Sequence, residues 1–215
     1  MKPSDCVIVI GRQCGCGGRE LGEKLAERLG IPFYDRHLFQ ETADDTGMRS
    51  DLLERHDERR PSGLGAWLAS GFGAAHISYN EATLSGGALQ KLQGEAVRKL
   101  MEKGSCVIVG RSADYIGRDL QNVFSVFLHA PLDYRVKRIK KEFPEGLSDE
   151  EIAGRITRTD RRRCDYYNDF TGRKWGQADN YHLSIDTSLA GLDDIADNIV
   201  KILETFCSKK NKSTN

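Results

Sequence analysis

The chain has 215 residues, and its 32 lysines and arginines are balanced by 32 aspartates and glutamates, so the formal net charge at pH 7 is zero. That length fits one α/β domain with an inserted piece and can bury a substantial core without disulfides or metals. A zero net charge argues against a duplex-binding protein, which more often carries a global basic excess, and no apolar run approaches the roughly 18–20 residues needed to span a bilayer.

The first elements predict a strand, a glycine-rich turn and a helix. Residues 6–10 are a continuous β-branched run, typical of a strand buried on both faces. The turn occupies residues 11–18, and a helical repeat of leucines then runs up to Gly30, which ends the helix. Residues 31–35 predict a short second strand that closes on the carboxylate of Asp35.

The middle of the chain alternates between helix and strand patterns. Residues 36–85 are polar and broken by glycines, and we expect them to be a mostly helical insertion. Residues 89–100 predict an amphipathic helix. Residues 106–109 predict a third buried strand, which is followed at once by Gly110-Arg111, and residues 123–128 predict a fourth strand.

The last third begins with a basic helix around Val136 and then shows a helix start. Ser148 is a good N-cap residue, and Glu151 stands at the capping-box position three residues later. That helix runs into the densest basic cluster of the chain, formed by Arg155, Arg158, Arg161, Arg162 and Arg163.

Residues 181–185 predict a fifth strand, and residues 192–202 predict the last helix. Residues 209–215 form a polar tail that we expect to be disordered. Because strands alternate with helices throughout, the sequence predicts an α/β fold with a five-stranded parallel sheet, helices on both faces and right-handed crossovers.

The glycine-rich turn is the strongest functional feature. Gly15, Gly17 and Gly18 permit positive φ and close backbone approach. Their N–H groups can converge on a phosphate, helped by the positive end of the following helix. A tight turn without a ligand is the alternative, although a bare turn rarely needs three glycines in four positions.

Two kinds of nucleotide site compete for this turn. In the dinucleotide fingerprint G-x-G-x-x-G, the third glycine would fall on Glu20, although Asp35 stands where a ribose-binding acid belongs. In the mononucleotide motif G-x-x-x-x-G-K-[ST], Gly17 can be the second glycine, which puts the lysine on Gly18 and the hydroxyl on Arg19. The loop therefore has the mononucleotide shape without the usual lysine and hydroxyl.

Several segments resemble the cytidylate kinase-like family of P-loop proteins. The resemblance spans most of the chain and is weakest over residues 36–85. It is carried by Gly11-Arg-Gln-Cys-Gly-Cys-Gly-Gly-Arg-Glu20, Leu29-Gly-Ile-Pro-Phe-Tyr-Asp35, Val107-Ile-Val-Gly-Arg-Ser-Ala-Asp114, Asp160-Arg-Arg-Arg-Cys-Asp-Tyr-Tyr167, Thr171-Gly-Arg-Lys-Trp-Gly176 and Asn180-Tyr-His-Leu183.

The resemblance implies a three-layer P-loop kinase fold with a helical monophosphate-binding insertion and an arginine-rich lid. The usual reaction is transfer of phosphate from ATP to CMP or dCMP. True cytidylate kinases carry the loop lysine, and they carry an aspartate where this chain has Val109. We expect one domain over residues 1–208, with its core at 1–35, 86–143 and 180–208, the insertion at 36–85 and the lid at 144–179.

Phosphoryl transfer requires positioning and positive charge around the migrating group. Because the loop lysine is absent, Arg12 and Arg19, which flank the loop, are the nearest substitutes, since arginine can make two parallel contacts to phosphate. In the basic cluster we expect Arg158, Arg162 and Arg163 to touch phosphates. The alternatives are an Arg19 that points to solvent and a basic helical face without a ligand.

The remaining candidates are assigned by their place at the sheet edge or by the resemblance. Arg111 and Asp160 are expected to bind the acceptor, and Asp35 to bind the acceptor or Mg²⁺. Glu20 is the other candidate for Mg²⁺, although it can simply be a favourable acid in the first helical turn. We expect the ATP phosphates to be bound by Gly11, Arg12, Gln13, Gly15, Cys16, Gly17, Gly18, Arg19 and Glu20.

The six cysteines match no zinc pattern and the N-terminus shows no signal peptide, so we expect a cytoplasmic protein with reduced thiols. Its expected partners are ATP and a nucleoside monophosphate, with no membrane and no nucleic acid. Two alternatives stay open: a nucleotide-binding regulatory protein that has lost catalysis, and a kinase of another small acceptor.

Overall fold

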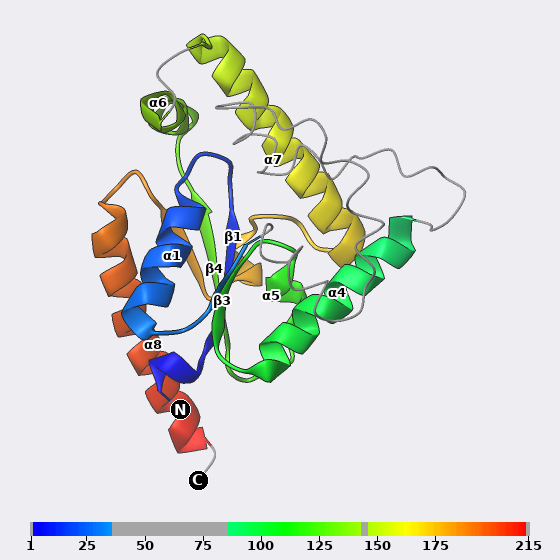
Figure 1. Cartoon of the computed structure of the whole chain (residues 1–215), viewed down its shortest axis with the longest axis vertical. Helices are drawn as coiled ribbons and strands as arrows, with labels where there is room; N and C mark the ends of the chain where they lie inside the picture. Colours follow the sequence, from blue (N-terminus) through cyan, green and yellow to red (C-terminus); the bar gives the residue numbers. More distant parts are fainter. Residues whose placement is uncertain (1, 36–85, 143–145, 214–215) are drawn as a thin grey trace.

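The structure is a computed structural model that describes residues 2–35, 86–142 and 146–213. The expected monophosphate-binding insertion at 36–85 lies outside the described residues. The described chain forms one parallel sheet between layers of helices (Figure 1). The sheet order is β2-β3-β1-β4-β5, and every pairing is parallel, which confirms the expected α/β fold.

The strands are β1 (Val7–Arg12), β2 (Phe33–Tyr34), β3 (Cys106–Val109), β4 (Val123–His129) and β5 (Leu183–Asp186). The α-helices are α1 (Gly18–Leu29), α4 (Gly86–Lys103), α5 (Ala113–Ile116), α6 (Leu132–Glu142), α7 (Asp149–Thr171) and α8 (Leu192–Ser213). Short 3₁₀ helices cover Pro3–Asp5 and Ala178–Asn180.

The central strand β1 is apolar on both sides because helices cover both faces of the sheet. Ile8 and Ile10 belong to the cluster that packs on α1 and α8. Val7 and Val9 belong to the cluster on the opposite face, where α4 and α5 lie. The parallel register of β1 against β3 and β4 brings the carboxyl ends of these strands to one edge of the sheet.

The predicted start of α7 is confirmed. The Ser148 hydroxyl accepts a hydrogen bond from the Glu151 N–H, and the Glu151 carboxylate accepts one from the Ser148 N–H. Two of the N–H groups at the start of the helix are thereby satisfied. The helix then continues to Thr171 and ends at Gly172, which adopts a left-handed conformation.

Two boundaries differ from the sequence-based expectation. The second strand is limited to Phe33–Tyr34, because Pro32 has no N–H to donate to a ladder. The last helix extends to Ser213, so residues 209–213 are helical rather than part of a disordered tail. Lys209 and Lys210 carry positive charge near the negative end of that helix, which favours its continuation.

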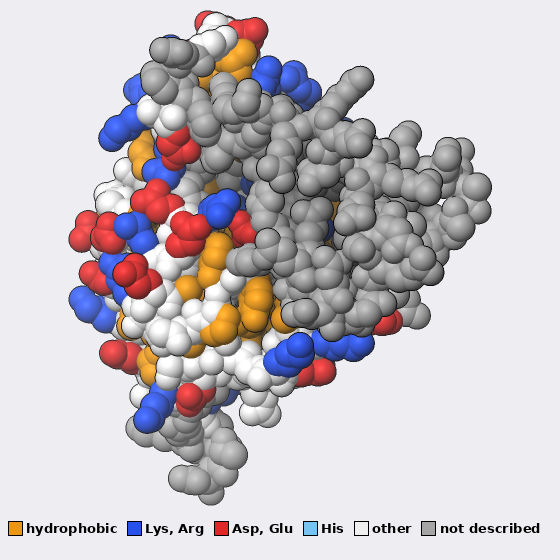
Figure 2. Space-filling model, in the orientation of Figure 1, with side chains coloured by type: hydrophobic (Ala, Val, Ile, Leu, Met, Phe, Trp, Pro, Cys, Tyr) orange, Lys and Arg blue, Asp and Glu red, His pale blue; other side chains and the backbone are white. Residues whose placement is uncertain are grey.

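One flank of the molecule carries intermixed charges of both signs over α1 and α8 (Figure 2). Lys24 and Arg28 of α1 form ion pairs with Asp193 and Asp197 of α8, at 2.7–2.9 Å between nitrogen and oxygen. Such exposed pairs each contribute at most about 1 kcal/mol, so the buried apolar contacts hold the two helices together. In the described part of the chain, no helix has the length and apolar character needed to cross a membrane.

Candidate functional site

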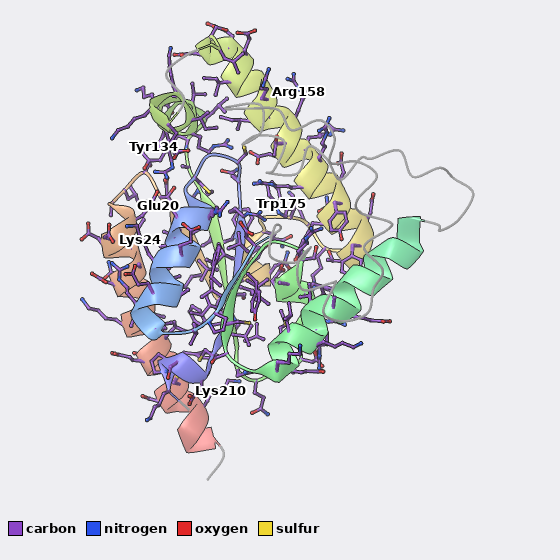
Figure 3. The ribbon with its side chains drawn as sticks, viewed as in Figure 1. Glu20, Lys24, Tyr134, Arg158, Trp175 and Lys210 are labelled. Carbon is purple, nitrogen blue, oxygen red and sulfur yellow. The ribbon has the colours of Figure 1, made fainter. Side chains whose placement is uncertain are left out.

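A pocket opens where β1 and β3 end, on the side covered by α7. It combines glycine backbone, basic side chains and aromatic rings. Figure 3 shows Trp175 in the region between β1 and α7. The pocket is lined by Gly11, Arg12, Gly110, Arg111, Ser112, Asp114, Arg163, Tyr166, Tyr167, Trp175 and Tyr181. In open α/β sheets, ligands bind in this position, beyond the carboxyl ends of the strands.

The side chain of Arg12 crosses the pocket between two glycines. A Cβ atom on Gly18 would stand 2.8 Å from Arg12 Cγ, and a Cβ on Gly110 would stand 2.1 Å from Arg12 Nη1. The aliphatic stem of Arg12 therefore lies on Gly18, and its guanidinium lies against Gly110. If Gly17 is the second glycine of the mononucleotide motif, Gly18 falls on the lysine position. The arginine fills space that a side chain at position 18 would need.

Three arginines converge in this pocket. Arg163 is buried, with 7% of its surface exposed, and donates a hydrogen bond from Nη1 to the carbonyl oxygen of Arg12 at 2.9 Å. Burial, together with the positive charges of Arg163 and Arg111, lowers the pKa of Arg12 to about 9. Such a concentration of guanidinium groups favours an anion with more than one negative charge.

The turn after β3 is held in an unusual backbone conformation. Gly110, Arg111 and Ser112 follow one another with φ values of +85°, +59° and +49°. Left-handed conformations cost non-glycine residues about 1–3 kcal/mol and cluster at ligand sites. Here the strained turn holds Arg111 and Ser112 at the wall of the pocket.

Asp114 and two tyrosines form the polar part of the aromatic wall. The Tyr167 hydroxyl donates a hydrogen bond to Asp114 Oδ2 at 2.7 Å. Burial raises the pKa of Asp114, and this hydrogen bond opposes the shift. Tyr181 packs against Phe127 of β4, with ring centroids 4.9 Å apart, so the rings are anchored to the sheet.

The glycine-rich loop has the expected left-handed glycines, since Gly15 and Gly17 have φ values of +82° and +81°. Gln13 is used structurally, because its Oε1 accepts the Ala130 N–H at 3.2 Å. Cys16 is buried, which raises its pKa to about 12, and burial also raises the pKa of Cys14. Burial therefore favours the neutral thiol at both positions.

The sequence matches the profile of the Cytidylate kinase-like family over residues 7–189, which is most of the chain. The protein belongs to the cytidylate kinase-like family. Among curated proteins, a search finds no match.

Solved structures confirm the fold of this family member. An uncharacterized protein from Eubacterium ventriosum ATCC 27560 is 30% identical, with a TM-score of 0.68 over 94% of this chain and 99% of that chain. A gluconokinase from Sinorhizobium meliloti 1021 has 12% identity and a TM-score of 0.51, covering 98% and 95%. A shikimate kinase from Bacteroides thetaiotaomicron has 15% identity and a TM-score of 0.50, covering 93% and 98%.

Three of the candidates in this cytidylate kinase-like chain form ion pairs away from the pocket. Arg19 Nε lies 2.9 Å from Glu23 and 3.4 Å from the buried Asp35. Glu20 pairs with Arg138 of α6 and lies 3.8 Å from Lys24 (Figure 3). Within residues 2–35, 86–142 and 146–213, no group of three or more His, Cys, Asp or Glu could hold a metal.

The basic cluster on α7 divides by helical phase. Arg158, Arg161 and Arg162 are exposed, whereas Arg163 is buried and lines the pocket. Figure 3 shows Arg158 along α7, toward the end remote from Trp175. Asp160 is not among the residues that line the pocket, and its carboxylate instead accepts hydrogen bonds from the Cys14 N–H and from Arg135.

Three contributors to the site went unrecognised in the sequence. Asp114 stands within a segment that carries the family resemblance, one turn beyond β3, so its position was a usable signal. Tyr181 begins the predicted fifth strand, and only the packed sheet brings it to Gly11. Arg135 lies on a basic helix that reads as solvent-exposed, and no local pattern indicates that it is buried.

Proposed function

We propose that the protein is an ATP-dependent kinase that transfers a phosphoryl group to a nucleoside monophosphate, with CMP or dCMP as the acceptor. The observation that carries the proposal is the convergence of Arg12, Arg111 and Arg163 in an aromatic-walled pocket beside the glycine-rich loop. Membership of the cytidylate kinase-like family supports the same reaction.

The pocket has the chemistry that a nucleoside monophosphate requires. The three guanidiniums supply positive charge and paired N–H donors, which suit a phosphate dianion. The rings of Tyr166 and Trp175 offer flat surfaces for a base, since an aromatic ring stacks on any nucleobase. The glycine-rich loop then receives the ATP phosphates, with the positive end of α1 behind it.

The proposed catalytic charges are Arg12 and Arg163, which line the pocket. The exposed Arg19, Arg158 and Arg162 complete the set as proposed contacts to the ATP phosphates. Mg²⁺ would enter bound to ATP and neutralise phosphate charge. Asp35, a buried carboxylate just past the end of β2, is the proposed metal ligand, since Mg²⁺ commonly takes one or two carboxylates with phosphate oxygens. Mg²⁺ would there replace Arg19, whose Nε lies 3.4 Å from the Asp35 carboxylate.

A coupled assay of ADP release against a panel of nucleoside monophosphates tests the proposal. We expect turnover with CMP or dCMP above the ATP hydrolysis seen without an acceptor. Binding of ATP without turnover on any acceptor would reject the kinase proposal.

A regulatory nucleotide-binding protein is the second candidate. It is favoured by Gly18 and Val109, which stand where cytidylate kinases carry a lysine and an aspartate. A kinase of another small acceptor is separated from both by extending the acceptor panel to sugars and hydroxy acids.

A further inference from the structure

The tip of the glycine-rich loop, Cys14–Gly15, lies between α6 and α7. The Cys14 side chain is buried in an apolar cluster with Val136 and Ile139 of α6 and with Ile152 and Ile156 of α7. Gly15 fits equally closely, because a Cβ there would stand 3.1 Å from Ile139 Cδ1 and 3.2 Å from Arg135 Cβ. The loop tip is therefore packed as a part of the helix pair.

Hydrogen bonds to the N–H and to the carbonyl oxygen of Cys14 also hold the loop tip. The Cys14 N–H donates to Asp160 Oδ1 at 2.7 Å, and the Cys14 carbonyl accepts from Arg135 Nη1 at 3.1 Å. The same Arg135 nitrogen donates to Asp160 Oδ2 at 2.5 Å, which closes a ring of hydrogen bonds. The Arg135 and Asp160 side chains are only 9% and 14% exposed, so water competes weakly with these bonds.

A carboxylate thus already occupies one of the N–H groups at the tip. In a phosphate-binding loop these groups face the anion. Phosphates must then bind farther along, from Gly15 to the start of α1, where the left-handed glycines lie. The conformation of that stretch depends on where Cys14, the residue directly before it, is held.

We propose that Asp160 and Arg135 are positioning residues, which fix the loop tip on α7 and thereby set the geometry of the ATP phosphate site. The inference rests on the proposed function for the identity of the ligand, and it gives Asp160 a role in binding ATP rather than the acceptor. Because Arg163 lies one helical turn beyond Asp160, the same helix sets the loop and the acceptor pocket.

The test measures hydrogen–deuterium exchange of the loop peptide, residues 13–18, and the affinity for Mg-ATP in the full chain. Asp160→Ala removes the oxygen that accepts the hydrogen bond from the Cys14 N–H. Asp165→Ala is the matched control, because Asp165 also lies on α7 and forms an exposed ion pair with Arg161. Asp160→Asn keeps an oxygen that can accept the Cys14 N–H.

We expect Asp160→Ala to speed loop exchange and to weaken Mg-ATP binding by about tenfold or more, the size expected for losing a hydrogen bond to a charged group. Asp160→Asn should have a smaller effect on both, and Asp165→Ala should change neither. The acceptor KM should stay within about threefold in all the variants, whereas a direct acceptor role would raise it.

Unchanged loop exchange and ATP affinity in folded Asp160→Ala, or a loss confined to the acceptor KM, would overturn the proposal. If Asp160→Ala does not fold, Arg135→Lys decides, because lysine keeps the charge but cannot span both partners, and wild-type loop exchange in that variant would refute the positioning role. Faster loop exchange in Asp160→Ala, with no ATP binding even by the wild type, would sustain the positioning role and reject the kinase function.

Discussion

Arg163 of α7 donates a hydrogen bond to the carbonyl oxygen of Arg12, the last residue of β1, at 2.9 Å. This contact joins the long helix to the strand that leads into the phosphate loop. Both side chains also line the pocket. Arg163 therefore holds the backbone of Arg12 in place and also adds a second positive charge beside the Arg12 guanidinium.

Replacing Arg163 should weaken acceptor binding. We expect Arg163→Ala to raise the acceptor KM by about tenfold to a hundredfold, since hydrogen bonds to charged groups contribute about 1.5–3 kcal/mol. Arg163→Lys keeps the charge but loses the two-pronged geometry, so its KM should be intermediate. Steady-state kinetics at saturating ATP measures both. Arg161→Ala, an exposed neighbour on α7, is the control, and an equal loss there would point to a general effect of helix charge.

Arg12 and Gly18 should show strong epistasis. Arg12→Ala should lower kcat/KM by at least about tenfold, because a phosphate-binding charge is lost. Gly18→Lys should also lower it, because the new Cβ would stand 2.8 Å from Arg12 Cγ. The double variant removes the Cγ contact, which leaves only the Cβ of residue 12 at 3.1 Å, and supplies a lysine at the usual P-loop position. It should exceed both single variants in kcat/KM, and a double variant no better than the worse single one would disprove the steric argument.

The strained turn after β3 should respond oppositely to two substitutions. Ser112→Gly relieves a left-handed serine, and after the entropic cost of glycine we expect about 1 kcal/mol of added stability. Gly110→Ala should cost about 2 kcal/mol, because it introduces strain at φ +85° and displaces the Arg12 guanidinium that lies against Gly110. Urea denaturation measures both free energies of unfolding. Equal effects would mean that the backbone conformation is not the cause.

His182 should make stability depend on pH. Its Nδ1 accepts the Ser125 N–H at 3.0 Å, so protonation of Nδ1 would break this bond. Burial and the charge of Lys210 lower the pKa of His182 in the folded chain. The unfolded chain then binds more protons between the folded pKa and the ordinary value of about 6.5.

This contribution is complete above about pH 6.5 and is lost as the pH falls toward the folded pKa. Between about pH 7.5 and about pH 5.5, wild type should therefore lose more stability than His182→Asn, whose side-chain oxygen can still accept the Ser125 N–H. Chemical denaturation at both pH values measures the difference. Parallel losses in the two proteins would assign the pH dependence to other groups.

The fold was predictable because its signals are local. The β-branched runs located β1, β3 and β4, and the Ser148–Glu151 capping box marked the start of α7. Arg111 could be placed at the pocket because it follows a buried strand at its carboxyl end. Each of these inferences needs only neighbours in the sequence.

The candidate site was less predictable because side-chain partners come from distant segments. Arg158 and Arg162 share a helical face, but the buried face of α7 runs through Ile152, Ile156 and Arg163. The spacing of Ile152 and Ile156 in the sequence already marks the buried face of the helix. Extending that helical spacing toward the C-terminus would have singled out Arg163. Arg135 gave no such signal, because its partners are 25 and 121 positions away.

The packing of Arg12 on Gly18 also has an evolutionary consequence. In a loop with the common lysine at position 18, we expect neither the gain of this arginine nor the loss of the lysine to be harmless as a single substitution. One order of change creates a steric clash, and the other leaves the loop without either charge. We therefore expect glycine at position 18 and arginine at position 12 to occur together in related sequences.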